Sequence, residues 1–217
     1  MTAIQKNPTV ESVTVYCSSS SALERHFAEE ARTLGRSIAE YGLTFVYGGG
    51  SIGLMGQSAR SCKDHGGTVV GIITGKLDEL EHGWRGCHEL QIVDSMQERR
   101  HRMMDRGDAY IVLPGGLGTY EEFFEVLVAR QLGDHEKPIV IINQNQYYAP
   151  LIAMIDHGIE HRFIRPAIRD ALIVVDRAAD ALAGLMAHRP RRHDPAEFLF
   201  LPAEVTDEEF AEFRMAS

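Results

Sequence analysis

The stretch from Ala109 to Leu132 reads AYIVLPGGLGTYEEFFEVLVARQL and contains the pattern that decides the fold. Its first five residues are apolar and β-prone, so they predict a buried strand at 109–113. The turn PGGLGT follows, and the residues from Thr119 to about Leu132 predict a helix. A strand that enters a helix through a glycine-rich turn is typical of open α/β sheets.

The same unit of strand and helix repeats along the chain. Alternation of strands with helices predicts parallel strands, right-handed crossovers and a sheet covered on both faces. We therefore expect one α/β domain at 1–189 and a tail at 190–217 that is a short amphipathic helix, a partner-docking arm or a loosely ordered terminus. Strands are predicted at 13–17, 43–47, 68–73, 90–93, 109–113, 137–142 and 172–175, and residues 74–89 are predicted to be irregular. Helices are predicted at 22–41, 54–65, 95–106, 119–132, 147–160 and after the last strand to about residue 187.

The composition restricts the class of protein and its partners. The chain has 217 residues with 44% hydrophobic and 24% charged, an ordinary globular balance. A net charge of −9 disfavours nucleic acid and anionic membranes as partners. No apolar run reaches the roughly 18 residues of a membrane span, and the N-terminus lacks the order of a signal peptide. Three widely spaced cysteines without a CxxC pair predict a reducing, cytoplasmic location.

A first glycine cluster, GGGSIGLMG at 48–56, follows the second predicted strand. It contains GxGxxG, a pattern typical of dinucleotide sites, which also need a carboxylate about 20 residues later. That region reads Ile72-Ile73-Thr74-Gly75, and no carboxylate occurs before Asp78. The cluster is therefore interpreted as a tight turn that lets the next helix pack closely.

The second glycine cluster, at 115–118, predicts a phosphate site. Backbone N–H groups and the positive end of a helix attract phosphate at such a turn, and Thr119 adds a hydroxyl. Glu122 has two interpretations. TYEE at 119–122 has the pattern of a capping box, in which Glu122 accepts from the Thr119 N–H. Alternatively, Glu122 is a functional carboxylate that faces a sugar ring beside the bound phosphate.

Two adjacent arginines follow a second capping-box pattern, Ser95 to Glu98. Met96 and Met103 predict the buried stripe of this helix, and the arginines at 99–100 flank it. They are either surface side chains that extend to water or guanidinium groups that bind a phosphate or a ribose.

These residues carry a resemblance. The combination of YGGGSIGLMG, SMQERRHRM, PGGLGTYEE and ARQLG resembles the LOG ("Lonely Guy") family of cytokinin riboside 5′-monophosphate phosphoribohydrolases, over about 13–187. The resemblance implies a Rossmann-like three-layer fold with a mostly parallel central sheet. It also implies hydrolysis of the N-glycosidic bond of AMP or N6-modified AMP to the free base and ribose 5-phosphate, without a cofactor or a metal. A homodimer or a higher homo-oligomer is implied as well.

The resemblance assigns roles residue by residue. Arg99 and Glu122 match the family's two catalytic residues, and Arg100, where the family usually has Lys, matches a nucleotide-binding residue. Glu79 matches an upstream binding carboxylate. A carboxylate such as Glu122 can stabilise an oxocarbenium-like ribose or orient water, whereas Arg99 cannot act as a proton donor. The resemblance also implies that one loop binds the monophosphate and the ribose. This loop comprises Gly115, Gly116, Leu117, Gly118, Thr119, Tyr120 and Glu121.

The chain departs from the family pattern at three places. Cys17-Ser18-Ser19 replaces the usual CGS, a threonine before QLG is replaced by Val128 or Ala129, and the tail is longer than the family core. These differences concern base preference and assembly more than the reaction.

Other functions are weighed against this one. A general AMP nucleosidase and a nucleotide-binding regulator without activity remain open. A pyridoxal-phosphate decarboxylase is disfavoured, because neither glycine cluster contains a lysine for the Schiff base. Cys17 is interpreted as a core residue and not as a nucleophile. His157 and His161 are spaced to face one metal ion, but no third ligand is evident, so they are interpreted as helix surface.

Overall fold

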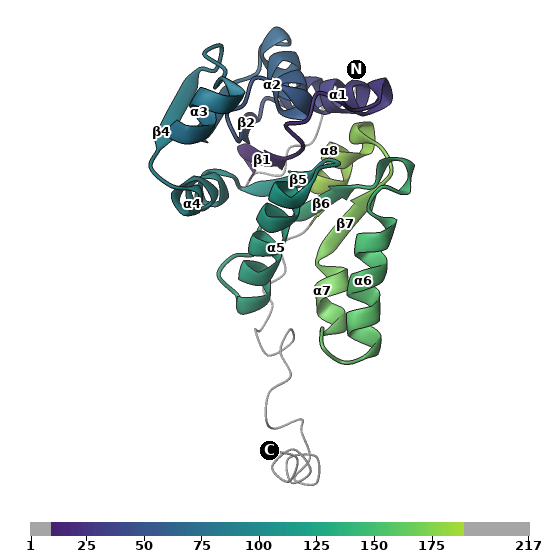
Figure 1. The fold of residues 1–217 in the computed structure, drawn as a ribbon. Helices are drawn as coiled ribbons and strands as arrows, with labels where there is room; N and C mark the ends of the chain where they lie inside the picture. Colours follow the sequence, from purple (N-terminus) through teal and green to yellow (C-terminus); the bar gives the residue numbers. More distant parts are fainter. Residues whose placement is uncertain (1–9, 189–217) are drawn as a thin grey trace, which may run out of the picture.

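A computed structural model describes residues 10–188, and within this range seven strands form one parallel sheet (Figure 1). They are β1 (Ser12–Tyr16), β2 (Thr44–Tyr47), β3 (Val69–Thr74), β4 (Glu89–Val93), β5 (Ala109–Val112), β6 (Ile139–Ile142) and β7 (Leu172–Val175). Their order across the sheet is β4-β3-β2-β1-β5-β6-β7, and each neighbouring pair is parallel. The predicted α/β fold with a parallel central sheet is confirmed.

Helices cover both faces of the sheet, which gives three layers. One face packs against α1 (Arg25–Glu40), α2 (Gly53–Asp64) and α8 (Ala178–Ala187). The other face packs against α4 (Met96–Arg106), α5 (Leu117–Leu132), α6 (Ala149–Glu160) and α7 (Pro166–Asp170). Among residues 10–188, no helix is long and apolar enough to span a bilayer.

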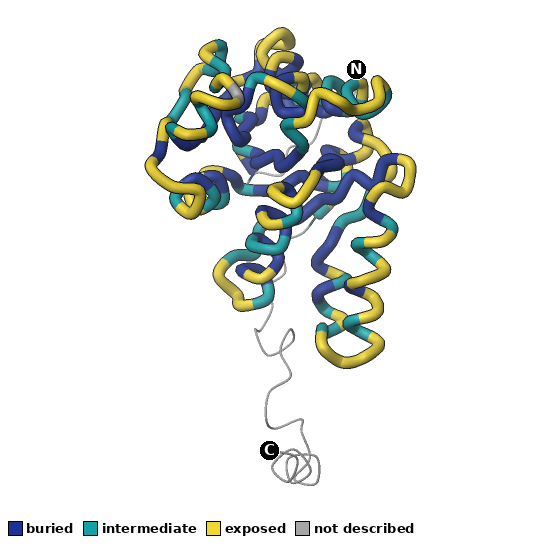
Figure 2. Tube along the Cα trace, viewed as in Figure 1, coloured by how far each residue is buried: buried dark blue, intermediate teal, exposed yellow. Residues whose placement is uncertain are grey.

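The strands read as apolar runs because both of their faces are buried. In β5, Ala109 and Ile111 join the core beneath α1, α2 and α8, whereas Tyr110 and Val112 join the core beneath α4 to α7. Successive side chains of a strand point to opposite faces, so a strand covered on both sides is apolar throughout. Figure 2 shows the result: the strands are buried between the two layers of helices, and the helices are exposed on their outer faces.

Most predicted elements agree with the observed ones within two or three residues, and three regions differ. Residues 74–89 were expected to be irregular, which is wrong in part, because α3 (Gly75–Glu81) begins there with the Thr74 hydroxyl as its N-cap. Residues 144–146 form the 3-10 turn η1 (Gln144–Gln146), so α6 begins at Ala149 and not at 147. The short helix α7 was not predicted. The tail at 190–217 lies outside the described residues, and the domain boundary at 189 stays a prediction.

Close contact between α1 and α2 depends on a glycine in α1. A Cβ added at Gly35 would lie 2.1 Å from the backbone oxygen of Ser58 in α2. The hydroxyl of Ser61, also in α2, donates to the Arg32 carbonyl of α1 at 2.7 Å. The backbones of the two helices therefore approach more closely than a side chain at residue 35 would allow.

We expect Gly35→Ala to destabilise the protein. Alanine favours a helix over glycine by about 1 kcal/mol, but forcing the two backbones apart costs typically 1–3 kcal/mol, so the steric term should dominate. Urea denaturation should show a lower midpoint. Gly184→Ala in α8 is the matched control, because its Cβ would meet side-chain methyls and no backbone atom, with Ile173 at 3.2 Å and Val175 at 3.8 Å. A Gly35→Ala protein as stable as the wild type would contradict this packing.

Candidate active site

The candidate site lies at the carboxyl ends of the strands, where the strand order changes direction. From β1 the chain continues to β2 on one side, while β5 pairs with β1 on the other. Connections that leave a parallel sheet in opposite directions open a crevice between adjacent strand ends, and ligands of α/β proteins bind there. The crevice is expected between the loops that follow β1 and β5.

A cavity of about 340 Å³ occupies this position. Its wall combines the loop after β1, the glycine-rich turn after β5, and side chains from four helices. The residues that line it are Cys17, Ser18, Ser19, Ser20, Met55, Leu77, Met96, Arg99, Gly116, Leu117, Gly118, Thr119 and Glu122. This volume is within the range of small-molecule sites, and the lining mixes apolar side chains with a few polar groups.

A buried ion pair forms the floor of the cavity. Arg99, in the first turn of α4, donates from Nη1 to Oε1 of Glu122 in α5 at 3.0 Å. Both residues are only 3–4% exposed. Arg99 also donates from Nε to the Ile72 carbonyl at 3.0 Å and from Nη2 to the Gly48 carbonyl at 3.2 Å. Its interpretation as a surface side chain is therefore wrong.

The stagger of two strands makes room for the guanidinium. The last residue of β2, Tyr47, is the register partner of Gly71, and β3 continues three residues further to Thr74. The Arg99 guanidinium occupies the space beyond the end of β2, beside the part of β3 that extends past it. A Cβ at Gly48 would lie 1.7 Å from its Nη2, so any side chain there would displace the guanidinium. The first glycine cluster thus contributes space for an arginine, and Gly48–Gly53 are absent from the cavity wall.

Glu122 is held in an environment that disfavours its charge. Burial raises the pKa of its carboxyl to about 7, although the adjacent Arg99 guanidinium lowers it. The capping-box interpretation of Glu122 is wrong, because α5 begins at Leu117 with Gly116 as its N-cap. Glu122 consequently lies in the second turn of the helix, and its side chain reaches Arg99 instead of the backbone.

The glycine-rich turn presents the start of α5 to the cavity. The first intrahelical bond runs from the Tyr120 N–H to the Gly116 carbonyl. The N–H groups of residues 117–119 precede this bond, and such groups have no partner inside their helix. Thr119 is nearly fully buried, and a Cβ at Gly115 would lie 2.1 Å from its hydroxyl oxygen. The turn therefore combines free donors with a positive helix end, as an anion site requires.

Two consecutive tyrosines support this turn from behind. The Tyr147 hydroxyl donates to the Gly115 carbonyl at 2.6 Å, and the Tyr148 hydroxyl donates to the Leu113 carbonyl at 2.7 Å. They follow Asn145 and Gln146, whose φ angles of 51° and 60° are uncommon for residues other than glycine. No sequence motif indicated these tyrosines.

The structure brings only part of the predicted set to the cavity. Arg99, Glu122 and residues 116–119 line it, and Gly115 lines an adjoining cavity of about 190 Å³. Arg100 instead forms ion pairs with Glu121 at 3.0 Å and Glu125 at 2.9 Å, which join α4 to α5. Tyr120 and Glu79 do not line the cavity either, although α3, which carries Glu79, contributes Leu77.

Some lining residues were not predicted. The serines after β1 are brought in by backbone bonds from Leu54 and Met55 of α2 to the Ser18 carbonyl, at 2.9 and 3.3 Å. Met96 was expected in the buried stripe of its helix, but it is 38% exposed and forms part of the cavity wall. A methionine near a helix start gives no sequence signal that separates core from site.

The observed geometry gives no support to the two chemistries disfavoured from the sequence, a nucleophilic Cys17 and a Schiff-base lysine in the cavity. Cys17 is buried, and burial raises the pKa of its thiol well above the usual range, which opposes nucleophilic attack. Among residues 10–188, no lysine lines the cavity. Lys63 and Lys137, for example, bind backbone carbonyls of Gly86 and Met104.

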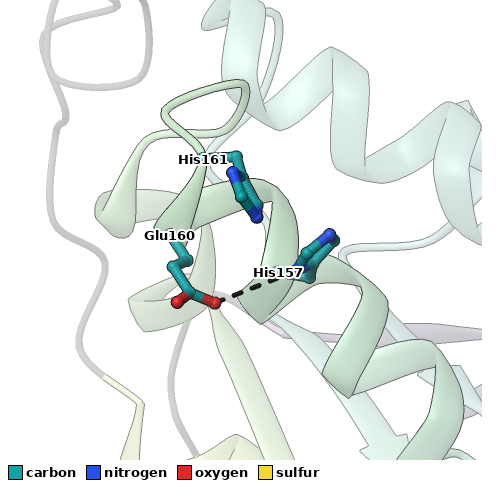
Figure 3. Close-up of side chains that lie close together, drawn as sticks. All are labelled: His157, Glu160 and His161. Atoms are coloured by element: carbon teal, nitrogen blue, oxygen red, sulfur yellow. Dashed lines mark ion pairs between the residues drawn. The ribbon is translucent and has the colours of Figure 1, made fainter.

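The surroundings of His157 and His161 differ from the expectation in one respect, the presence of a third possible metal ligand. A third ligand was not evident from the sequence, and the structure places Glu160 beside both imidazoles at the end of α6 (Figure 3).

Comparison with known proteins connects this geometry to a family. The sequence model of a family described as "Possible lysine decarboxylase" matches residues 55–185. A cytokinin riboside 5′-monophosphate phosphoribohydrolase of Rhodococcoides fascians is 43% identical over 182 residues, or 83% of this chain and 92% of that protein. The phosphoribohydrolase LOG3 of Arabidopsis thaliana is 36% identical over 178 residues, or 82% of this chain and 83% of that protein.

Solved structures show a similar fold at low sequence identity. A molybdenum cofactor binding protein of Rippkaea orientalis superposes with a TM-score of 0.62 and 17% identity, covering 80% of this chain and 94% of that chain. The molybdenum cofactor carrier protein of Chlamydomonas reinhardtii gives a TM-score of 0.60 and 20% identity, with 79% and 92% covered. At these identities the likeness concerns the fold.

We expect the carboxyl of Glu122 to titrate near pH 7 in a carbon-13 NMR titration, with Glu122→Gln to assign the resonance. Arg99→Met should shift this titration to higher pH, because it removes the charge that stabilises the carboxylate. A titration of Glu122 near the ordinary value of about 4.3 would contradict the buried environment.

The same raised pKa predicts how stability depends on pH. The contribution of the buried neutral carboxyl is complete below the unfolded-state pKa of about 4.3, and it is lost as the pH rises through about 7. Glu122→Gln cannot ionise, so its free energy of unfolding should increase relative to the wild type across this window. Parallel curves for the two proteins would mean that Glu122 has the same pKa in the folded and unfolded states, and would contradict the raised pKa.

Proposed function

This chain belongs to the LOG family of cytokinin riboside 5′-monophosphate phosphoribohydrolases, and we propose that it hydrolyses the N-glycosidic bond of an adenine-type nucleoside 5′-monophosphate. The products are the free base and ribose 5-phosphate. The observation that supports this proposal is the buried Arg99–Glu122 pair, which lines the same cavity as the exposed N-terminus of α5.

The phosphate of the substrate binds at the start of α5. The N–H groups of residues 117–119 and the positive end of the helix attract the anion, and the serines at 18–20 face it from the loop after β1. Binding energy from this non-reacting group can orient the bond that breaks. The base lies toward Met55, Leu77 and Met96, because these apolar side chains suit the face of a purine.

Glu122 acts on the ribose as the base leaves. Positive charge develops on the sugar in an oxocarbenium-like transition state, and a nearby carboxylate stabilises it or orients the attacking water. Arg99 keeps a larger fraction of Glu122 ionised, because it lowers a pKa that burial raises. Three of its N–H groups already bind protein oxygens, so its main contribution is to hold Glu122 in position.

Assembly, location and domain organisation belong to the same proposal. Leu117, Val128 and Leu132 on α5 are 85%, 49% and 52% exposed, which supports a homodimer or a higher homo-oligomer. Three free cysteines support a cytoplasmic location. A single catalytic domain at 1–189 without a nucleic-acid partner is consistent with the continuous sheet and the net charge of −9.

The test is a product assay with AMP, GMP and N6-isopentenyl-AMP that measures the free base and ribose 5-phosphate. We expect release from the adenine nucleotides, and Glu122→Gln should lower kcat by about 10²-fold or more. A preference for the N6-substituted substrate supports a cytokinin role, and equal rates support a general AMP nucleosidase. A nucleotide recovered intact after long incubation would identify a binding protein without activity and refute the proposal.

A second prediction separates positioning from binding. Gly48→Ala should displace the Arg99 guanidinium, so kcat should fall by about tenfold to a hundredfold, while KM changes little. Gly75→Ala is the matched control, because it also follows a strand and its added methyl enters open space. A larger effect on KM than on kcat would indicate that Gly48 acts on substrate binding instead.

A further inference from the structure

A group of metal-ligating side chains lies at the end of α6, away from the catalytic cavity. His157, Glu160 and His161 each offer one ligand atom, and these atoms all lie within 4.8 Å of one another (Figure 3). Across residues 10–188, no second group of three or more such ligands is found. The group is not part of the site described above.

Helix geometry accounts for the convergence of these side chains. Residues spaced by three and four positions lie on the same face of a helix, which applies to His157, Glu160 and His161. The two imidazole rings are 4.3 Å apart at their centres and inclined by 73°. All three residues are exposed, so a metal ion can reach them without any rearrangement of the core.

The donor set suits a divalent transition metal. Two imidazoles and one carboxylate are typical ligands of Zn²⁺, with a fourth position left for water. The contact that binding would replace is weak, because His157 Nδ1 and Glu160 Oε2 are 3.8 Å apart and attract each other only when the histidine is protonated. The negative end of the helix dipole also favours a cation at this place.

Neighbouring charges leave the group available. Asp156 of α6 pairs with Arg169 of α7 at 3.3 Å and so does not compete for the histidines. The chain leaves α6 through Arg162, which has a φ of 62°, and turns towards α7. An ion on the last turn of α6 would therefore hold the helix end that precedes this turn.

We propose that His157, Glu160 and His161 form a surface site for one divalent transition-metal ion, with Zn²⁺ as the best match. The ion stabilises the last turn of α6. This helix returns the chain from the carboxyl end of β6 to the amino end of β7 (Figure 1). The metal site therefore lies near the amino ends of the strands, whereas the catalytic cavity lies at their carboxyl ends. Nucleotide hydrolysis is therefore independent of this ion.

The experiment is a calorimetric titration of the untagged, chelator-treated full chain with Zn²⁺ at about pH 7.5. We expect one ion per chain and a rise in Tm when Zn²⁺ is added. His157→Ala combined with His161→Ala should abolish both effects, and Glu160→Gln should weaken binding by about tenfold. Each variant should keep the Tm of the wild type without metal, because the replaced side chains are exposed.

His101→Ala provides a matched control. His101 is 66% exposed, lies on a helix and pairs with Asp105 four residues later, but has no second imidazole beside it. The His101→Ala variant should bind Zn²⁺ as tightly as the wild type does. Absorption of bound Co²⁺ adds a readout that is independent of heat, with a tetrahedral spectrum that the double variant lacks. Failure of the wild type to bind one ion, or unchanged binding by the double variant, would overturn the proposal.

Discussion

The ion pair between Arg99 and Glu122 is the constraint on which the rest of the site depends. Removing two charges from water is costly, and the mutual attraction of a buried pair offsets that cost only when the remaining donors are also satisfied. The Ile72 and Gly48 carbonyls meet this condition on the arginine side. The stagger of β2 and β3, the missing side chain at residue 48 and the placement of α4 all follow from this requirement.

The two glycine clusters solve opposite electrostatic problems. The cluster after β2 leaves room for a cation inside the protein, whereas the turn after β5 exposes backbone donors to an anion outside it. Both are local arrangements within a chain of net charge −9. A strongly acidic protein can therefore receive a phosphate, because groups within a few ångströms determine the potential in a cavity more than distant surface charges do.

The sequence predicted the strands and most helices, because apolar runs and glycine-rich turns carry local signals. The resemblance singled out Arg99 and Glu122 as site residues, but the ion pair between them was not predicted. It failed where two local patterns looked alike. TYEE at 119–122 fits a capping box, but the preceding glycines allow α5 to begin two residues earlier. Met96 was expected in the core but lines the cavity, and Arg100 was expected at the site but pairs with carboxylates of α5. Helix periodicity does not show which elements will pack against each face. Glu160 was missed because an exposed carboxylate becomes informative only once its neighbours are placed.

The two tyrosine hydroxyls behind the glycine-rich turn have a consequence for the turnover cycle. They fix the carbonyls of Leu113 and Gly115, so the turn is braced from the core side whether or not a substrate is present. A braced turn loses little conformational entropy when the substrate arrives, which leaves more of the interaction energy for affinity. The same bracing means that the glycine-rich turn can keep its shape when ribose 5-phosphate leaves.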